Sequence, residues 1–181
     1  MKKIFRHYCE TRSVEDFKWE IVELEKTVCV RVTDVWEFCM KRDMLIWGED
    51  GFYYPVDHKS RSKINKWWAK KFKRGSQMTG YCWGTEREKG VPCEGAYINA
   101  IELGLLPYSD KKCRTHGKPY SECSAEHSKF QLFYVDRTKW RKAKWLDGAC
   151  GLVEKAIHYG KVYDTLDKLQ FAPTGGELVG S

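Results

Sequence analysis

The chain has 181 residues, a net charge of +7, eight tryptophans and eight cysteines. At this length one domain buries roughly two-thirds of its unfolded surface, so the fold does not require disulfide bonds for stability. No apolar run approaches the ~18 residues of a membrane span, and the polar residues 1–7 contain no signal-peptide core. We therefore expect an intracellular, cytoplasmic chain with no membrane partner, whose cysteines are reduced thiols.

The sequence pattern of the first third of the chain predicts mainly strands. The expected strands are 2–9, 17–21, 28–32, 44–47 and 52–56. Alternation of apolar and polar residues pairs the second strand with the third, with a turn near Glu25. Asp50-Gly51 between two apolar runs is a strong signal for a second hairpin. Between the two hairpins, Thr33 is expected to cap a short helix at 34–42.

The rest of the chain predicts more helix. Helices are expected at 60–74, 93–105 and 147–159, a loop at 77–91, a strand at 130–135 and a short element at 162–169. This order indicates the α+β class, with small antiparallel sheets or hairpins and about four helices. They form a single compact domain, 1–171, or two small lobes, 1–76 and 77–171, followed by a flexible tail at 172–181.

Two segments carry the positive charge. Segment 59–74 holds eight cations and segment 137–144 holds five, with no acid in either. These contribute +13 to a net charge of +7, so the other residues sum to −6. A helix over 60–74 separates a lysine stripe from an apolar stripe. The lysines are Lys63, Lys66, Lys70 and Lys73, and the apolar residues are Ile64, Trp67, Trp68 and Phe72.

An ordinary amphipathic helix explains the apolar stripe but not the lack of acids. Lysines three or four residues apart on a helix repel one another. Binding of a polyanion such as a nucleic acid removes this repulsion, and it is favoured because counterions bound to the phosphates are released. We therefore predict contact with the phosphates of DNA or RNA, tolerant of sequence because lysine outnumbers arginine. The candidate contact residues are Lys59, Arg61, Lys63, Lys66, Lys70, Lys73, Arg74, Arg137, Lys139, Arg141, Lys142 and Lys144, and the stacking candidates are Trp67, Trp68 and Trp140.

Four cysteines and histidines lie close together in the sequence. They are Cys113, His116, Cys123 and His127, in the pattern C-x2-H-x6-C-x3-H. The first pair can form a knuckle around Gly117, and the second pair has the spacing that puts two ligands on one helical face. Four nitrogen and sulfur ligands suit tetrahedral Zn²⁺ with no open position, so the predicted site is structural. The alternative is four unrelated side chains in a polar loop.

A catalytic interpretation has weaker support. A papain-like, self-processing thiol protease needs a cysteine at a helix start and a downstream histidine, and Cys93 with His158 is the candidate pair. The alternative for Cys93 is a buried thiol, and for His158 a histidine near the end of a helix. The sequence contains no phosphate-binding loop and no nucleophile-elbow motif. We therefore lean against an enzyme.

The sequence thus favours a nucleic-acid-contacting accessory protein. The main alternative is a phage-type inhibitor of a defence nuclease, similar in size and composition to anti-CRISPR proteins, that docks on a protein or ribonucleoprotein. If they are exposed, its aromatic anchors would be Trp36, Trp47, Trp83 and Tyr97. A homodimer is compatible with either interpretation.

Overall fold

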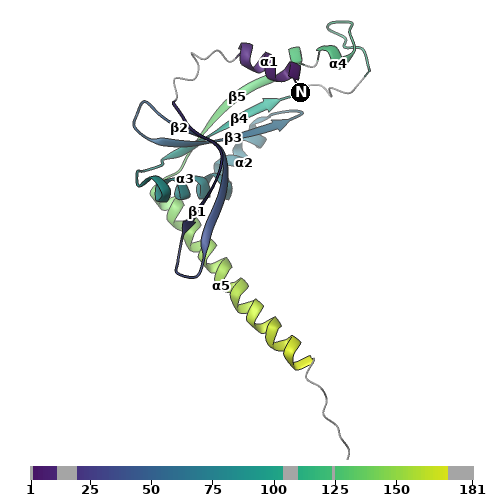
Figure 1. Ribbon diagram of the computed structural model, residues 1–181. Helices are drawn as coiled ribbons and strands as arrows, with labels where there is room; N and C mark the ends of the chain where they lie inside the picture. The colour runs from purple at the N-terminus through teal and green to yellow at the C-terminus, as the bar shows by residue number, and fades with distance from the viewer. Residues whose placement is uncertain (1, 12–19, 104–109, 124, 171–181) are drawn as a thin grey trace, which may run out of the picture. The chain divides into compact units, whose positions relative to one another are not determined.

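The computed structural model describes residues 2–11, 20–103, 110–123 and 125–170 (Figure 1). The chain divides into two compact units, Met1–Lys142 and Ala143–Ser181. The boundary predicted between two lobes, at 76 and 77, falls inside the first unit. The predicted tail at 172–181 lies outside the described residues.

The first unit is built on a five-stranded sheet in the order β1-β2-β3-β4-β5. Its strands are β1 (Glu20–Arg31), β2 (Glu37–Trp47), β3 (Tyr53–Arg61), β4 (Gly95–Glu102) and β5 (Lys129–Asp136). All neighbours are antiparallel except β3 and β4, which are parallel. A parallel pair requires a long crossover, and here two helices supply it. The predicted α+β class is confirmed.

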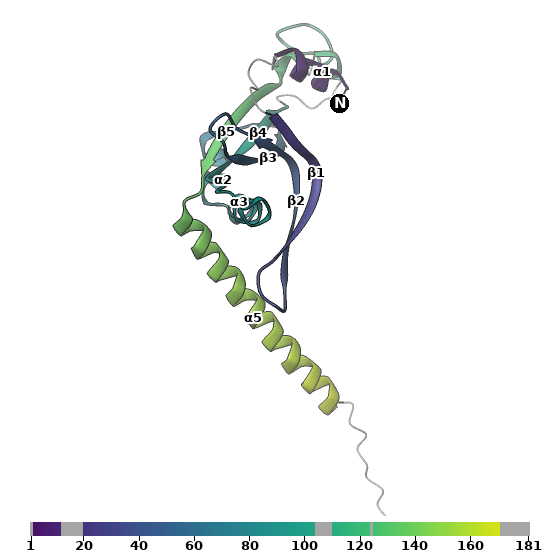
Figure 2. The same ribbon diagram turned by 60° about the vertical axis from the view of Figure 1, so that its left-hand side comes forward.

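Five helices accompany the sheet in the described part of the chain. They are α1 (Lys2–Thr11), α2 (Lys66–Arg74), α3 (Ser76–Lys89), α4 (Tyr120–Cys123) and α5 (Lys139–Gln170), with a 3₁₀ turn, η2, at Ala125–His127. The sheet curves around α3, seen end-on in Figure 2, and α3 contacts β1, β2, β3 and β4. No helix among the described residues has both the length and the hydrophobicity to cross a membrane.

The main core lies between the crossover helices and the sheet. Met78 and Cys82 of α3 pack against Ile98 of β4 and Val135 of β5, all fully or almost fully buried. Trp68 and Phe72 of α2 pack against the same cluster. The basic helix is therefore fixed to the sheet by its aromatic side.

Several sequence predictions are confirmed and others are wrong. The Asp50-Gly51 hairpin is confirmed as the β2–β3 turn, and the strand at 130–135 is confirmed within β5. The strand at 2–9 is wrong, since α1 occupies it, and the helix at 34–42 is wrong, since β2 starts at Glu37. The predicted turn at Glu25 lies within the continuous strand β1.

The segment predicted as a loop at 77–91 is instead mostly the central helix α3. Gly84 allows close packing of this helix on β2: a Cβ there would lie 2.7 Å from the Met40 sulfur. The helix predicted at 93–105 is wrong because this segment forms β4. Residues in β4 are buried on both faces, so no simple alternation marks it as a strand.

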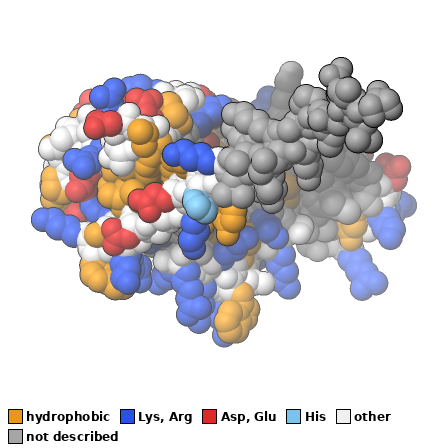
Figure 3. Space-filling model, turned by 90° about the horizontal axis from the view of Figure 1, so that it is seen from below, with side chains coloured by type: hydrophobic (Ala, Val, Ile, Leu, Met, Phe, Trp, Pro, Cys, Tyr) orange, Lys and Arg blue, Asp and Glu red, His pale blue; other side chains and the backbone are white. Residues whose placement is uncertain are grey.

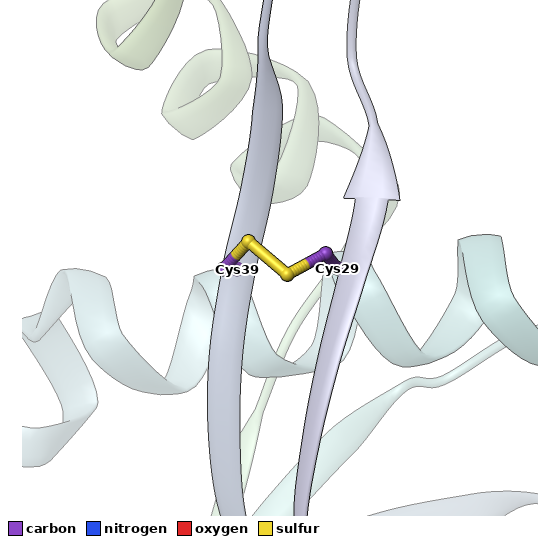
Figure 4. The surroundings of a disulfide bond; sticks show 2 residues. All are labelled: Cys29 and Cys39. Atoms are coloured by element: carbon purple, nitrogen blue, oxygen red, sulfur yellow. A yellow bond between two sulfur atoms is a disulfide. The ribbon is translucent and has the colours of Figure 1, made fainter.

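Two of the cysteines form a disulfide. Cys29 on β1 faces Cys39 on β2 at a Cα–Cα distance of 4.0 Å, and their sulfurs are bonded (Figure 4). The prediction that every cysteine is a reduced thiol is therefore wrong for this pair. Strand register, which the sequence did not reveal, brings the two side chains together.

A buried arginine joins β1, β2 and α3. The Arg42 guanidinium pairs with the carboxylates of Glu23 and Glu88 and donates to the Thr85 hydroxyl at 2.9 Å. Lys89 adds a second cation to Glu23 at 2.6 Å. Since a buried charge is costly unless it is paired, these contacts fix the β1–β2 hairpin against the central helix.

This network predicts a pH-dependent part of stability. Burial raises the pKa of Glu23, but hydrogen bonds from Lys26 and Lys89 and the charge of Arg42 outweigh it and lower the pKa to about 2. Because the pKa of Glu23 is lower in the folded than in the unfolded state, its ionisation stabilises the fold at pH values above the unfolded pKa. This stabilisation is lost as the pH falls from 4.5 toward 2. We expect Glu23→Gln to lower the free energy of unfolding at pH 7 by about 1–2 kcal/mol.

The check is urea denaturation of both proteins across this pH range. The difference between wild type and Glu23→Gln should shrink steadily as the pH falls. A difference that stays constant from neutral to acidic pH would show that Glu23 ionisation does not stabilise the network.

Candidate nucleic-acid interface and metal centre

The basic helix starts later in the structure than its sequence pattern suggests. The helix start predicted at Ser60 or Ser62 is wrong, because β3 continues to Arg61 and α2 begins at Lys66. Asn65 caps α2 instead, and its side-chain oxygen accepts from the backbone N–H groups of Trp67 at 3.1 Å and Trp68 at 2.9 Å. Just before the cap, the Ile64 N–H donates to the Glu102 carboxylate at 2.8 Å.

The two adjacent tryptophans of α2 differ in their surroundings. The Trp68 ring packs edge-on against Phe72, 4.7 Å between centroids, and lies 6.1 Å from the ring of Phe133 on β5. Trp67 is 68% exposed. Of the three stacking candidates, Trp68 therefore belongs to the core, while Trp67 and Trp140 are exposed.

The C-terminal end of α2 is held by Arg137, which is only 1% exposed. Its guanidinium donates to the backbone carbonyls of Phe72 at 2.6 Å and Gly75 at 3.3 Å. Burial lowers the pKa of Arg137 from its ordinary value. Its prediction as a phosphate-contacting residue is wrong, because the guanidinium is enclosed and points at the helix end.

Two other predicted contact residues are also engaged within the protein. Lys142, 4% exposed, pairs with Glu86 and donates to the Cys93 carbonyl at 3.1 Å. Lys59 pairs at 2.8 Å with Asp57, a carboxylate whose pKa is raised by burial. The Lys142 prediction is wrong, and Lys59 is a half-buried counterion. Asp57 is two residues from Lys59 on the same strand, but Glu86 is 56 residues from Lys142, and the sequence gives no sign of that pair.

The remaining cations of the first segment are exposed. They are Arg61, Lys63, Lys66, Lys70, Lys71, Lys73 and Arg74, and we call this set the α2 surface. Figure 3 shows Lys and Arg side chains spread over the visible side of the molecule, with acidic and hydrophobic side chains exposed among them. From the second segment, Lys139, Arg141 and Lys144 are exposed, and Arg141 lies 3.5 Å from the Asp136 carboxylate.

Trp67 lies between two lysines of the α2 surface. The Lys66 and Lys70 ammonium groups are 5.9 and 4.9 Å from the centroid of its ring. These are cation–π distances, so the exposed ring and the cations form one small site. An aromatic face beside positive charge is the arrangement that contacts a base and its phosphate together.

The four predicted metal ligands are brought together by the fold. A bridge between Lys112 and Pro119 closes a short turn around Cys113 and His116, in which Gly117 has a φ of 65°. The other two ligands follow at once, Cys123 at the end of α4 and His127 in η2. The ligand atoms of all four lie within 4.8 Å of one another, so this cluster could hold a metal ion.

The hydrogen bonds around the cluster favour a thiolate. Burial raises the pKa of Cys113, but the backbone N–H groups of Thr115 and His116 and the His127 ring lower it to about 6. The Cys113 sulfur lies 3.2 Å from His127 Nε2 and 3.7 Å from His116 Nδ1. The other nitrogen of His116 lies 3.3 Å from the Glu126 carboxylate, a partner that orients a metal-binding imidazole. Glu126 was not predicted from the sequence.

The environment of Cys93 does not suit the predicted catalytic role. Cys93 precedes β4 rather than a helix, is fully buried, and its sulfur lies 3.5 Å from the Gly95 carbonyl. The prediction that it occupies a helix start is wrong. His158 is exposed on α5 in the second unit. A buried thiol cannot attack a substrate, and the structure gives Cys93 no access.

Comparison with known proteins identifies no relative. No family model, no curated protein and no solved structure matches this chain. The chemistry of the α2 surface and of the Cys/His cluster therefore carries the functional argument.

The role of Arg137 can be measured by substitution. Arg137→Met keeps an apolar stem but removes the charged donor from the Phe72 and Gly75 carbonyls, which retain only the Gly75 N–H and the Thr79 hydroxyl. We therefore expect the free energy of unfolding to fall by about 1–3 kcal/mol. Arg141→Met, at an exposed position nearby, should change it by less than about 0.5 kcal/mol. Urea denaturation compares the two. Equal effects would contradict the capping role.

Proposed function

We propose that this protein binds DNA or RNA through the phosphate backbone, using the α2 surface. The observation that carries the proposal is a group of seven exposed cations around one anchored helix, with no acid in the segment. Mutual repulsion makes such a surface unfavourable by itself. Neutralisation by phosphates removes that repulsion and releases counterions, which makes binding favourable.

The composition of the α2 surface suggests which part of the nucleic acid it contacts. Five of its seven cations are lysines, which act as point charges on phosphates, while reading of base edges relies on bidentate groups such as arginine. The proposed binding is therefore tolerant of sequence. Trp68 and Phe72 of α2 are packed against the core, so the helix is already ordered before a ligand binds.

Charge reversal on α2 tests the proposal. Lys66→Glu/Lys70→Glu should weaken binding to a mixed-sequence oligonucleotide by about tenfold or more, because two phosphate contacts become repulsive. Fluorescence anisotropy at low salt measures the affinity. Both side chains are exposed, so the circular dichroism spectrum should not change.

Arg31→Glu/Lys155→Glu is the matched control, with the same change in net charge at two exposed positions, one of them on β1 at the edge of the sheet. It should lose much less affinity than the α2 variant. Equal losses would mean that the overall charge, rather than the α2 surface, determines binding.

We propose further that the Cys/His cluster holds one structural Zn²⁺. Four nitrogen and sulfur ligands complete a tetrahedral site without an open position, so the ion would stabilise the 110–127 region rather than act on a substrate. The backbone N–H groups directed at Cys113 and the carboxylate beside His116 are the outer contacts that such a site uses.

Metal content tests the zinc proposal. Native mass spectrometry should find one zinc ion per chain in the wild type and none in Cys123→Ser, because three ligands hold the ion far more weakly. Cys150→Ser, outside the cluster, should keep its zinc. A folded wild type that is free of metal after growth and purification with zinc would refute the proposal.

Docking on a protein target is a second candidate, supported by a different observation. Strand β1 forms one edge of the sheet and carries three exposed apolar side chains, Ile21, Val22 and Leu24. An exposed apolar edge strand is a common site of strand addition by a partner. The aromatic anchors expected from the sequence fit less well: Trp83 is buried and Trp36, Trp47 and Tyr97 are half-buried.

A further inference from the structure

We infer that the α2 surface recognises single-stranded rather than duplex nucleic acid, with Trp67 as the surface on which an unpaired base stacks. This inference rests on the proposed function and specifies its substrate. The inference is based on two observations. The exposed ring of Trp67 lies beside the ammonium groups of Lys66 and Lys70, and the other aromatic residues of α2, Trp68 and Phe72, are packed against the core.

The exposure of Trp67 is not required by the packing of α2. Ile64, Trp68 and Phe72 already anchor the helix to the core, whereas the Trp67 residue is 68% exposed to solvent. A large apolar ring in solvent is unfavourable, and a lysine at this position would be compatible with the helix. Exposed aromatics held on a rigid, basic element are typical of base-stacking sites.

The two flanking lysines fit the same role. Lys66 and Lys70 lie near the Trp67 ring at 5.9 and 4.9 Å, and each has a long side chain that can turn toward a phosphate. When a base stacks on the ring, its own phosphates come within reach of these ammonium groups. A single nucleotide can then stack its base on the Trp67 ring and place its phosphate beside the lysine ammonium groups.

A second exposed tryptophan lies near the other end of α2. Arg137 bonds the C-terminal end of α2, and Trp140, also 68% exposed, follows it three residues later in the first turn of α5. The nine residues of α2 span about 13 Å, and Lys71, Lys73 and Arg74 lie toward the Trp140 end. A strand of several nucleotides can therefore contact cations along the length of α2.

A duplex would not use these rings. Its bases are already stacked on one another, so an indole can reach a base face only where the base is unpaired. Entry of α2 into a groove would instead favour arginine, asparagine or glutamine toward the base edges, and the α2 surface is mainly lysine. The tryptophans therefore distinguish a single strand from a duplex.

The test compares oligonucleotides of about 15 nucleotides, oligo-dT and oligo-rU as single strands and a mixed duplex of the same length, by fluorescence anisotropy at low salt. We expect the wild type to prefer the single strands. Trp67→Ala should weaken single-strand binding by about tenfold and change duplex binding by less than about twofold. Trp67→Phe, which keeps an aromatic face, should retain most of the affinity.

Tyr159→Ala is the matched control, because Tyr159 is an exposed aromatic residue on the second unit. It should leave all three affinities unchanged, and a thermal melt should show that each variant is folded. Equal weakening of single-strand and duplex binding by Trp67→Ala, or a wild type that binds duplex as tightly as single strands, would overturn this inference and leave the proposed function intact. Failure to bind any of the three at low salt would overturn both.

Discussion

The arrangement of the basic surface depends on one buried cation, Arg137. Its guanidinium is enclosed and directed at the carbonyls of Phe72 and Gly75, where α2 ends and α3 begins. An unpaired buried charge would be strongly unfavourable, so these hydrogen bonds lock the end of α2 to the residue that follows β5. The exposed lysines are presented by a helix that is held at both ends, by Asn65 at its start and Arg137 at its close.

The cations of the two basic segments consequently divide into two groups with different roles. Lys142 and Arg137 stabilise the interior, Lys59 neutralises a buried carboxylate, and the exposed remainder forms the α2 surface and its neighbours. A run of like charges in sequence does not therefore correspond to a patch of the same charge in space. The fold therefore reduces the number of cations available to a ligand. Two of the exposed ones, Lys66 and Lys70, lie beside the exposed ring of Trp67.

Local signals in the sequence predicted part of this structure. Asp50-Gly51 specified a turn, and the Cys/His spacing specified a cluster. The predicted apolar stripe of the basic helix is correct for Ile64, Trp68 and Phe72 but wrong for Trp67, which is exposed. The central helix α3 and strand β4 were missed because their residues are buried on several sides, which removes the periodicity that distinguishes helix from strand. The buried roles of Arg137 and Lys142 depend on partners more than fifty residues away, such as Glu86, and no local pattern encodes such pairs.

The central claim is that the α2 surface binds nucleic acid by neutralising phosphates, and the salt dependence of affinity measures this most directly. The seven exposed cations of this surface set the upper limit of the phosphates contacted. If about four to six of them contact phosphates, the logarithm of the association constant should fall against the logarithm of salt concentration with a slope between about −3 and −5. A slope near zero, or no detectable binding at low salt, would contradict the account.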